Sequence, residues 1–339
     1  MALQASSGCY YGHLAQGQTR ILWGRLEIAD VLADPETPPP LADRLRMVGD
    51  ARDFGQNIGL EVDGQYTSYL PWPGDRIITT LVTTRPGQIE AQPFHFPLLG
   101  AVPYKGFFDE AMAEREATRL RDEGMDVCVS PVRAYSTLGY FDDPVSGPML
   151  RTSPGRLVET ILHELVHSTV FLEGQSDFNE GAANFIGQEA SVLFFAAEPE
   201  KAQRRRQEVR DSRALARFLL DFRDEIAVLY GESGNAATLP SARAASEEEA
   251  RKRLLSLPLA TYNPEQFSDS IALNDACLAL RGTYSEDIPL FEVALAQEGG
   301  DLSALIARLR AAAETEKPRA AFFRDAEIRG SRRPVQPGP

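Results

Sequence analysis

The 339-residue chain has few of the residues that mark several common classes of protein. Its three cysteines are Cys9, Cys128 and Cys277, and they form no C-x-x-C pair. The sequence therefore indicates neither a disulfide framework nor a cysteine-based zinc site. Cys128 and Cys277 each lie in an apolar local run, so we expect them to be buried structural thiols.

Positive charge and long apolar runs are scarce as well. The chain has 49 acidic residues against 35 basic ones, a formal charge of -14, which argues against a surface that follows a phosphate backbone. Nucleic acid is therefore not an expected partner. No apolar run approaches the roughly 18 residues that a membrane-spanning helix needs, so the chain is expected to be soluble.

The N-terminus carries one signal that points to a membrane. The segment Ser6 to Cys9 resembles the end of a bacterial lipoprotein cleavage site, in which small residues precede a cysteine that becomes lipidated. With an apolar signal upstream, this predicts membrane attachment through a lipid on Cys9 and a location in the cell envelope or periplasm. The alternative is an incidental cysteine in a frayed terminus of a cytoplasmic protein. Oligomeric state is not indicated by the sequence.

The pattern of apolar residues predicts an α+β fold that is mostly helical, with a small mixed β-sheet beside the helix that starts near Ser153. Helices are expected over Leu14 to Leu32, Leu41 to Ile58 and Asp109 to Glu123, the last of them ending at Gly124. Strands are expected over Tyr66 to Leu70, Arg76 to Thr84, Ile89 to Phe96 and Asp126 to Tyr135, and the chain after Thr152 is mostly helical.

Composition further suggests four segments along the chain. These are an N-terminal helical segment, a catalytic core, a C-terminal helical region and a disordered tail, over residues 1–58, 59–200, 201–329 and 330–339 respectively.

The most informative stretch is the helix predicted to start at Ser153 and Pro154, where serine can cap and proline suits the first position. It contains the H-E-x-x-H sequence of His163 to His167. Residues four apart lie on one helix face, so the two imidazoles converge as a metal clamp, and Glu164 is turned toward a bound water. The alternative is a pair of core histidines that bond to backbone carbonyls.

Zinc needs a third protein ligand, and an acidic residue after the helix is the economical choice. Gly174 is predicted to end the helix, and Ser176 or Asp177 to cap the next one. Two antiparallel helices hinged near Gly174 would set Glu180, thirteen residues after His167, level with it. Glu180 could instead complete a capping box, and three acidic residues are rival ligands: Glu173, Asp177 and Glu189.

These residues carry a resemblance to a known family. His163 to His167, followed by Phe178 to Ala183, resembles the H-E-x-x-H plus N-E-x-x-A pattern of gluzincin metallopeptidases, which have a zincin-like fold. More closely, the chain from Cys9 to about Leu309, including Gly100 to Phe108 and Ala134 to Pro144, is similar to bacterial proteins described as predicted zinc aminopeptidases, many of them lipoproteins. The resemblance implies a peptidase with the ligands and base assigned above.

Three positions depart from the pattern. The family often has cysteine at the position of Ala101, and related aminopeptidases have glutamate at the position of Gly187. Asn184 stands where thermolysin-like enzymes have an aspartate that orients a histidine ligand. The G-x-M-E-N segment, which recognises a free amino terminus in one aminopeptidase class, is absent from the chain.

The expected reaction is hydrolysis of a peptide or protein substrate by water activated at one Zn²⁺ ion, with Glu164 as general base and acid. Tyr135, Tyr140 and Tyr284 are candidates to stabilise the oxyanion, and Val127 to Leu138 is the candidate strand that pairs with substrate. Three alternatives stay open: a non-catalytic cell-envelope binding or scaffold protein, a zinc endopeptidase, and a zinc hydrolase of non-peptide amides.

Overall fold

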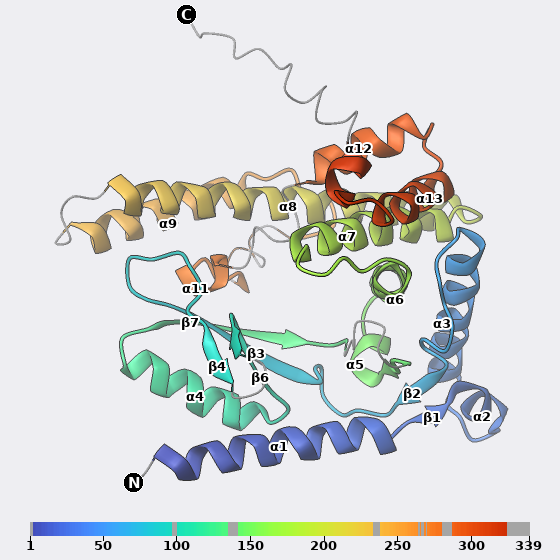
Figure 1. The fold of residues 1–339 in the computed structure, drawn as a ribbon, viewed down its shortest axis with the longest axis horizontal. Helices are drawn as coiled ribbons and strands as arrows, with labels where there is room; N and C mark the ends of the chain where they lie inside the picture. Colours follow the sequence, from blue (N-terminus) through green and yellow to red (C-terminus); the bar gives the residue numbers. More distant parts are fainter. Residues whose placement is uncertain are drawn as a thin grey trace, which may run out of the picture.

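A computed structural model describes residues 3–96, 100–134, 142–232, 238–263, 265, 268, 270–279 and 287–323. Helices account for most of these residues, and the strands form three small sheets, which confirms the α+β expectation. In Figure 1 the sheets lie below a layer of long helices, and helix α1 (Leu3–Trp23) runs along the opposite edge of the molecule. The predicted tail, residues 330–339, is outside the described residues.

The helix predicted from Leu14 to Leu32 is confirmed only in part, because the chain leaves α1 after Trp23 and becomes helical again at Ile28. A side chain on Gly24 would lie 2.6 Å from the backbone oxygen of Arg20, so glycine allows a tight exit there. Strand β1 (Leu26–Glu27) then pairs with β2 (Ser68–Leu70), and helix α2 (Ile28–Ala33) follows. The next predicted helix is confirmed as α3 (Pro39–Asn57), with proline in its first turn.

The central sheet is antiparallel, in the order β6 (Lys105–Phe107), β3 (Ile78–Thr84) and β7 (Asp126–Val132). Strands were predicted at both long-strand positions, and the second of these predictions rested on its valine content. Helix α4 (Glu110–Asp122) covers the sheet, and its Asp109 cap accepts a hydrogen bond from the Met112 amide at 2.7 Å. Tyr10 of α1 packs into the same buried cluster as Leu81 of β3 and Ala113 of α4.

The other two sheets are smaller. Strands β1, β2 and β8 (Val145–Ser146) form a mixed sheet, in which β2 pairs antiparallel to β1 and parallel to β8. Strand β4 (Phe94–Phe96) pairs with β5 (Gly100–Val102). The strand predicted over Ile89 to Phe96 is therefore confirmed only for its last three residues.

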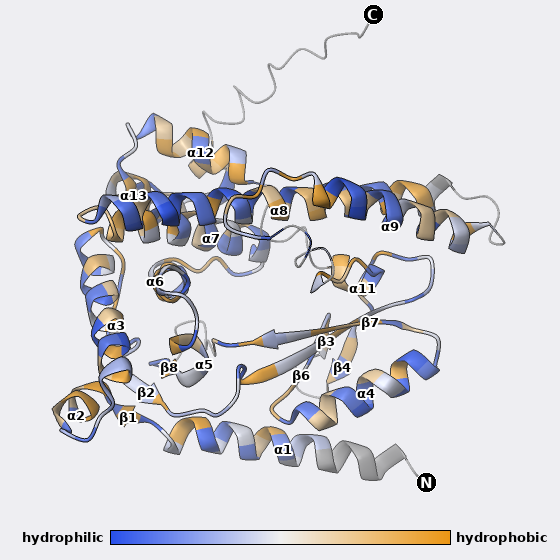
Figure 2. Ribbon diagram, turned by 180° about the vertical axis from the view of Figure 1, so that it is seen from behind, coloured by the Kyte–Doolittle hydropathy of each residue, from blue (hydrophilic) through white to orange (hydrophobic). Residues whose placement is uncertain are grey.

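The helical part contains the main core. Its elements are α5 (Gly147–Leu150), α6 (Pro154–Thr169), α7 (Ser176–Phe194), α8 (Pro199–Glu232), α9 (Leu239–Leu255), α11 (Asp275–Leu278), α12 (Ile288–Gln297) and α13 (Leu302–Ala313). Helices α6 and α7 pack along each other, and the largest buried cluster joins them to α3, α12 and α13. Figure 2 shows hydrophobic and hydrophilic residues on separate faces of many of these helices. None of the described helices combines the length and apolar content needed to cross a bilayer.

Cys128 and Cys277 correct one expectation, because they form a disulfide rather than two separate thiols. Their Cα atoms lie 4.8 Å apart, although 149 residues separate them in sequence. The bond ties β7 to α11, and Asn274 reinforces the junction by donating a hydrogen bond to Asp126 at 2.9 Å. A cross-link that closes so long a loop contributes roughly 2–4 kcal/mol to the free energy of unfolding. Spacing alone carried no sign of this pairing.

Candidate metal centre

Helix α6 begins where the sequence predicts and presents His163, Glu164 and His167 near its C-terminal end. Ser153 caps it by accepting a hydrogen bond from the Arg156 amide, and Pro154 is the first helical residue. The apolar residues Leu157, Ile161 and Leu165 have no exposed surface. Burial of this face holds α6 in one rotational setting, and the polar side chains of the other face therefore point in a defined direction.

The connection from α6 to α7 differs from the expectation. The helix ends at Thr169 rather than at Gly174, and Val170 to Gln175 join the two helices. Gly174 has a φ of +73°, so it supplies the left-handed residue of this turn. Asn179 secures the turn, because its amide accepts a hydrogen bond from the Leu172 amide at 3.0 Å and donates one to the Leu172 carbonyl at 2.8 Å.

Glu180 of α7 faces both histidines. The distance between the two Nε2 atoms is 3.2 Å, and the Glu180 carboxylate oxygens lie 3.5 Å from Nε2 of His163 and 3.4 Å from Nε2 of His167. A tetrahedral zinc site with bonds of about 2.0–2.2 Å has ligand atoms about 3.3–3.6 Å apart. The two Glu180 distances end on different carboxylate oxygens, and one atom from each of the three residues lies within 4.8 Å of the others. The three side chains are therefore close enough together to hold one ion. Within the described part of the chain this is the one group of three potential ligands.

The charges in this cluster favour a cation. Burial disfavours the charged form of Glu180, but its contacts with His163 and His167 lower the pKa of the carboxyl to about 2. For His163, burial opposes protonation and the contact with Glu180 outweighs it, which raises the pKa of the imidazole. A carboxylate that draws a proton to its histidine neighbours offers the same attraction to a divalent ion, which would take the place of that proton.

The rival ligands do not join the cluster. Glu189 is occupied, because its carboxylate forms ion pairs with Arg206 and Arg213, both at 2.8 Å. Glu173 and Asp177 are exposed and lie outside the group of potential ligands. The capping alternative for Glu180 also fails, since α7 has Gln175 at its N-cap without a side-chain cap.

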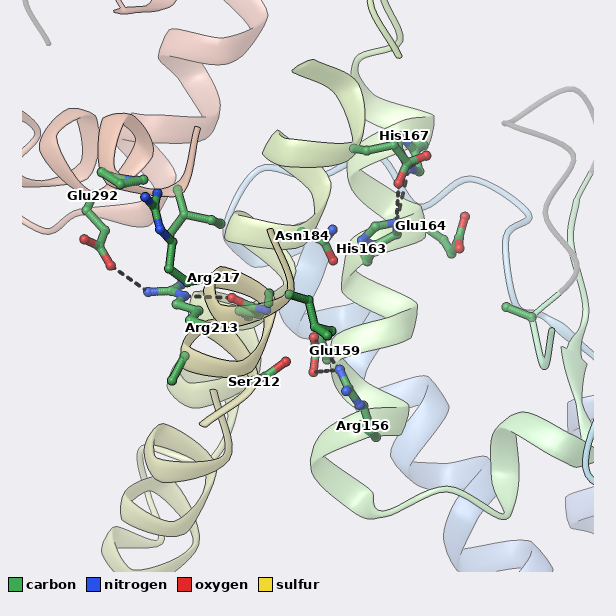
Figure 3. A pocket seen from close by; sticks show the side chains of 18 of the residues that line it. Arg156, Glu159, His163, Glu164, His167, Asn184, Ser212, Arg213, Arg217 and Glu292 are labelled. Carbon is green, nitrogen blue, oxygen red and sulfur yellow. Dashed lines mark hydrogen bonds and ion pairs between the residues drawn. The ribbon is translucent and has the colours of Figure 1, made fainter. Parts of the chain in front are cut away.

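Glu164 lines a cavity of about 830 Å³ together with His163, His167 and Glu180. Its carboxylate has no hydrogen bond to any residue that the structure describes, so it is available to accept a proton from a water. The close-up in Figure 3 shows Glu164 beside His163, turned to a different side of α6 from the paired imidazoles. Residues of α8 and the start of α12 form the opposite side of this cavity.

Comparison with known proteins gives a family for the chain. Residues 9–322 match the model of the family described as "Putative aminopeptidase". The chain belongs to this aminopeptidase family. No curated protein and no solved structure matches it. Family membership indicates peptidase activity, and the match covers the whole site that the geometry identifies.

In this member of the family, Gly187 sets the distance between the two helices that carry the candidate metal ligands, α6 and α7. A Cβ atom there would lie 3.1 Å from the Glu159 carbonyl oxygen, 3.1 Å from the His163 nitrogen and 3.2 Å from the His163 Cα. These are backbone atoms, which cannot rotate aside. The glutamate that related aminopeptidases have at this position therefore does not fit here, and the close approach of α7 to α6 depends on glycine.

Alanine at Gly187 is expected to move α7 away from α6 and to separate Glu180 from the histidines. We expect overpacking to lower the free energy of unfolding by roughly 1–3 kcal/mol. Zinc affinity should fall roughly 10–100-fold. Thermal unfolding measures the change in stability, and competition with a chromogenic chelator measures the change in zinc affinity.

The matched control is Gly49→Ala in α3, where an added Cβ meets nothing within 4 Å. This variant should keep its zinc affinity and gain about 0.5–1 kcal/mol, the difference between alanine and glycine inside a helix. Unchanged zinc binding by Gly187→Ala would contradict the role of this contact.

Among the described residues, we find few hydrogen-bond partners that would hold the candidate histidine ligands in position. Asn184 lines the cavity, but its side chain forms no hydrogen bond to a described residue. Nδ1 of His167 is buried and likewise has no partner among them. A histidine ligand usually donates its second ring N–H to a neighbouring group, which fixes its tautomer. We do not assign this role to Asn184.

The three tyrosines predicted to stabilise an oxyanion, Tyr135, Tyr140 and Tyr284, lie outside the described residues. Of the segment predicted to pair with substrate, β7 ends at Val132, and Val132 and Ala134 line the cavity. Its position at the site is consistent with that role, which stays a prediction.

Sequence patterns gave no sign of Tyr66, a buried tyrosine that feels the charge of Glu164. It is 1 % exposed, has a φ of +57°, and its hydroxyl has no hydrogen-bond partner among the described residues. Burial, followed by the negative charges of Glu164 and Asp143, raises the pKa of this phenol well above its ordinary value. Tyr66 therefore stays neutral, and its hydroxyl keeps a proton that it can donate in a hydrogen bond.

Proposed function

We propose that this family member is a zinc-dependent aminopeptidase of the gluzincin type. His163, His167 and Glu180 would hold one ion and leave its fourth position open. The observation that supports this most is that one potential ligand atom from each of these residues lies within 4.8 Å of the others. The two Nε2 atoms are 3.2 Å apart, and each has a Glu180 carboxylate oxygen at 3.4 or 3.5 Å, which is compatible with a tetrahedral zinc site. Two nitrogens and one carboxylate oxygen are also the donors of known catalytic zinc sites.

A zinc ion at this position would act as a Lewis acid and lower the pKa of a water toward about 7. The protein supplies the proton transfers. Glu164, whose carboxylate is not engaged by a described residue, takes a proton from the attacking water and delivers it to the leaving amine. Its position one residue after His163 keeps the carboxylate beside the metal without making it a ligand.

Two readings compete with this proposal. A non-catalytic binding protein could keep the three ligands, but it would have no need for an unengaged carboxylate next to the first histidine. An endopeptidase would use the same four residues, so the choice of an exopeptidase rests on the family to which the chain belongs.

The disulfide also bears on where the protein works. Disulfides persist mainly in oxidising compartments and are rare in the cytosol. The Cys128–Cys277 bond therefore favours the cell envelope over the cytoplasm as the location of this activity.

A zinc titration tests the function directly. Metal-free protein is expected to regain hydrolysis of aminoacyl fluorogenic substrates in proportion to added Zn²⁺, with a plateau at one ion per chain. The same protein should be much slower on peptides with a blocked amino terminus. Faster cleavage of the blocked peptides would favour the endopeptidase, and zinc binding without any hydrolysis would favour the non-catalytic reading.

A further inference from the structure

The cavity has a positively charged region two helical turns from the metal ligands. Arg156 precedes His163 by seven residues on α6, which places it on the same helix face and about 10 Å away along the axis. Figure 3 shows Arg156, Glu159 and His163 on successive turns of this face. A molecule bound at the candidate metal site and extending along α6 toward its N-terminus would therefore reach Arg156.

Arg156 is a half-exposed side chain that pairs with the buried carboxylate of Glu159. Its Nη1 donates to both carboxylate oxygens of Glu159, at 3.0 and 3.1 Å. Glu159 also pairs with Arg205, and the exposed fractions of these two side chains are 7 % and 5 %, against 47 % for Arg156. Arg205 is therefore a second cationic partner of this carboxylate, and it also pairs with Glu208 at 3.0 Å. Nε and Nη2 of Arg156 have no partner among the described residues, so these donors are free for a ligand.

A smaller pocket of about 170 Å³ adjoins the main cavity at this point. Arg156 and Ser212 line both spaces, and the small pocket adds further charged groups: Arg204, Arg205 and Glu208. With Glu159, three arginines meet two carboxylates, which leaves one positive charge on a chain whose net charge is -14. Ser212 belongs to α8, points toward the pair of Arg156 and Glu159, and forms no side-chain hydrogen bond to a described residue (Figure 3).

We propose that Arg156 and Ser212 bind a carboxylate of the substrate, so that the enzyme prefers peptides with a carboxylate roughly three residues from the scissile bond. The span follows from an extended chain, which covers 3.3–3.6 Å per residue. Guanidinium donors suit a planar carboxylate, and the serine hydroxyl supplies one more donor. The carboxylate is that of an Asp or Glu side chain or of the peptide C-terminus. The inference rests on the proposed peptidase function for the choice of a peptide as ligand.

Binding can be measured apart from turnover by using zinc-loaded Glu164→Gln protein. Two sets of peptides distinguish the sources of the carboxylate: one compares a free C-terminus with its amide, and the other compares Glu with Gln at each position. In one of these sets the acid is expected to bind about 10–100-fold more tightly, as charged hydrogen bonds worth 1.5–3 kcal/mol imply. Adding Arg156→Gln should bring the ratio close to one while affinity for the neutral peptides is retained. Ser212→Ala should also lower the ratio of acidic to neutral peptide affinity, but by a smaller factor than Arg156→Gln.

Arg217→Gln is the matched control, because Arg217 also lines the main cavity from α8 but not the small pocket. It should leave the preference intact. Zinc content and thermal unfolding establish that Arg156→Gln folds, and Arg156→Lys should keep part of the preference through its charge. Equal binding of acids and amides, or a preference that survives Arg156→Gln, would overturn the proposal.

Failure of the peptidase function would look different from failure of this inference. With Glu164 intact, Arg156→Gln should hydrolyse neutral peptides as the parent does and lose only the advantage of acidic ones. Acid-selective binding without hydrolysis of any peptide would refute the peptidase and leave the carboxylate site standing. Hydrolysis of peptides without a preference for acidic ones would support the peptidase function and refute the carboxylate site.

Discussion

Glutamine in place of Glu164 should lower kcat by about 10²–10⁴-fold while the zinc content stays near one ion per chain. The substitution preserves the size of the side chain but removes its ability to accept a proton. The three ligand atoms belong to other residues, so their arrangement is untouched. Elemental analysis of the purified variant, together with kcat on an aminoacyl substrate, gives both quantities from one preparation.

Glu173→Gln is a suitable control for this experiment. Glu173 is an exposed carboxylate in the connection between α6 and α7, outside the ligand cluster, and its loss should change neither zinc content nor kcat. A Glu164→Gln variant that turns over at the parental rate would remove Glu164 as the base. One that loses its zinc would instead indicate that Glu164 helps to hold the metal.

Alanine in place of Glu180 should weaken zinc binding by at least about 100-fold, beyond the range seen when only an outer partner of a ligand is removed. The change deletes the negative charge and the third donor atom, leaving two imidazoles, which is short of the three protein ligands of a catalytic zinc site. Competition with a chromogenic chelator measures the dissociation constant. Activity should return in part at high zinc concentration, since Glu164 is unchanged.

Asp177→Ala separates the loss of a ligand from the loss of a nearby charge. Asp177 is exposed in the first turn of the same helix and does not belong to the ligand group, so this variant should bind zinc as the parent does. If Glu180→Ala binds zinc with unchanged affinity, another residue must be the third ligand, and the assignment of the site would be wrong.

Much of the secondary structure followed from local signals. Ser153 and Pro154 start α6, and Asp109 and Gly124 bound the region of α4, because caps and breakers act within one turn of the backbone. The single helix predicted over Leu14 to Leu32 is interrupted between Trp23 and Ile28, partly for a non-local reason. Residues 26–27 pair with β2, and this pairing outweighs the helical pattern of their neighbours.

The position of Glu180 opposite His167 was predicted from an imperfect premise, and its role as a metal ligand stays a prediction. Gly174 does not end α6, but the connection from Val170 to Gln175 still contains the midpoint between His167 and Glu180. Antiparallel helices pair residues about that midpoint, so an error of several residues in the helix end did not change which side chain faces His167.

The sequence by itself determined the start of α6, the placement of two histidines and a glutamate on that helix, and the carboxylate that meets them across the next turn. Tertiary structure alone decided the disulfide between Cys128 and Cys277, the approach of α7 permitted by Gly187, and the wall of α8 that brings Ser212 opposite Arg156. The first group depends on spacing within or next to one helix, which the backbone repeat dictates. The second depends on contacts between distant segments, which form only when the whole core packs.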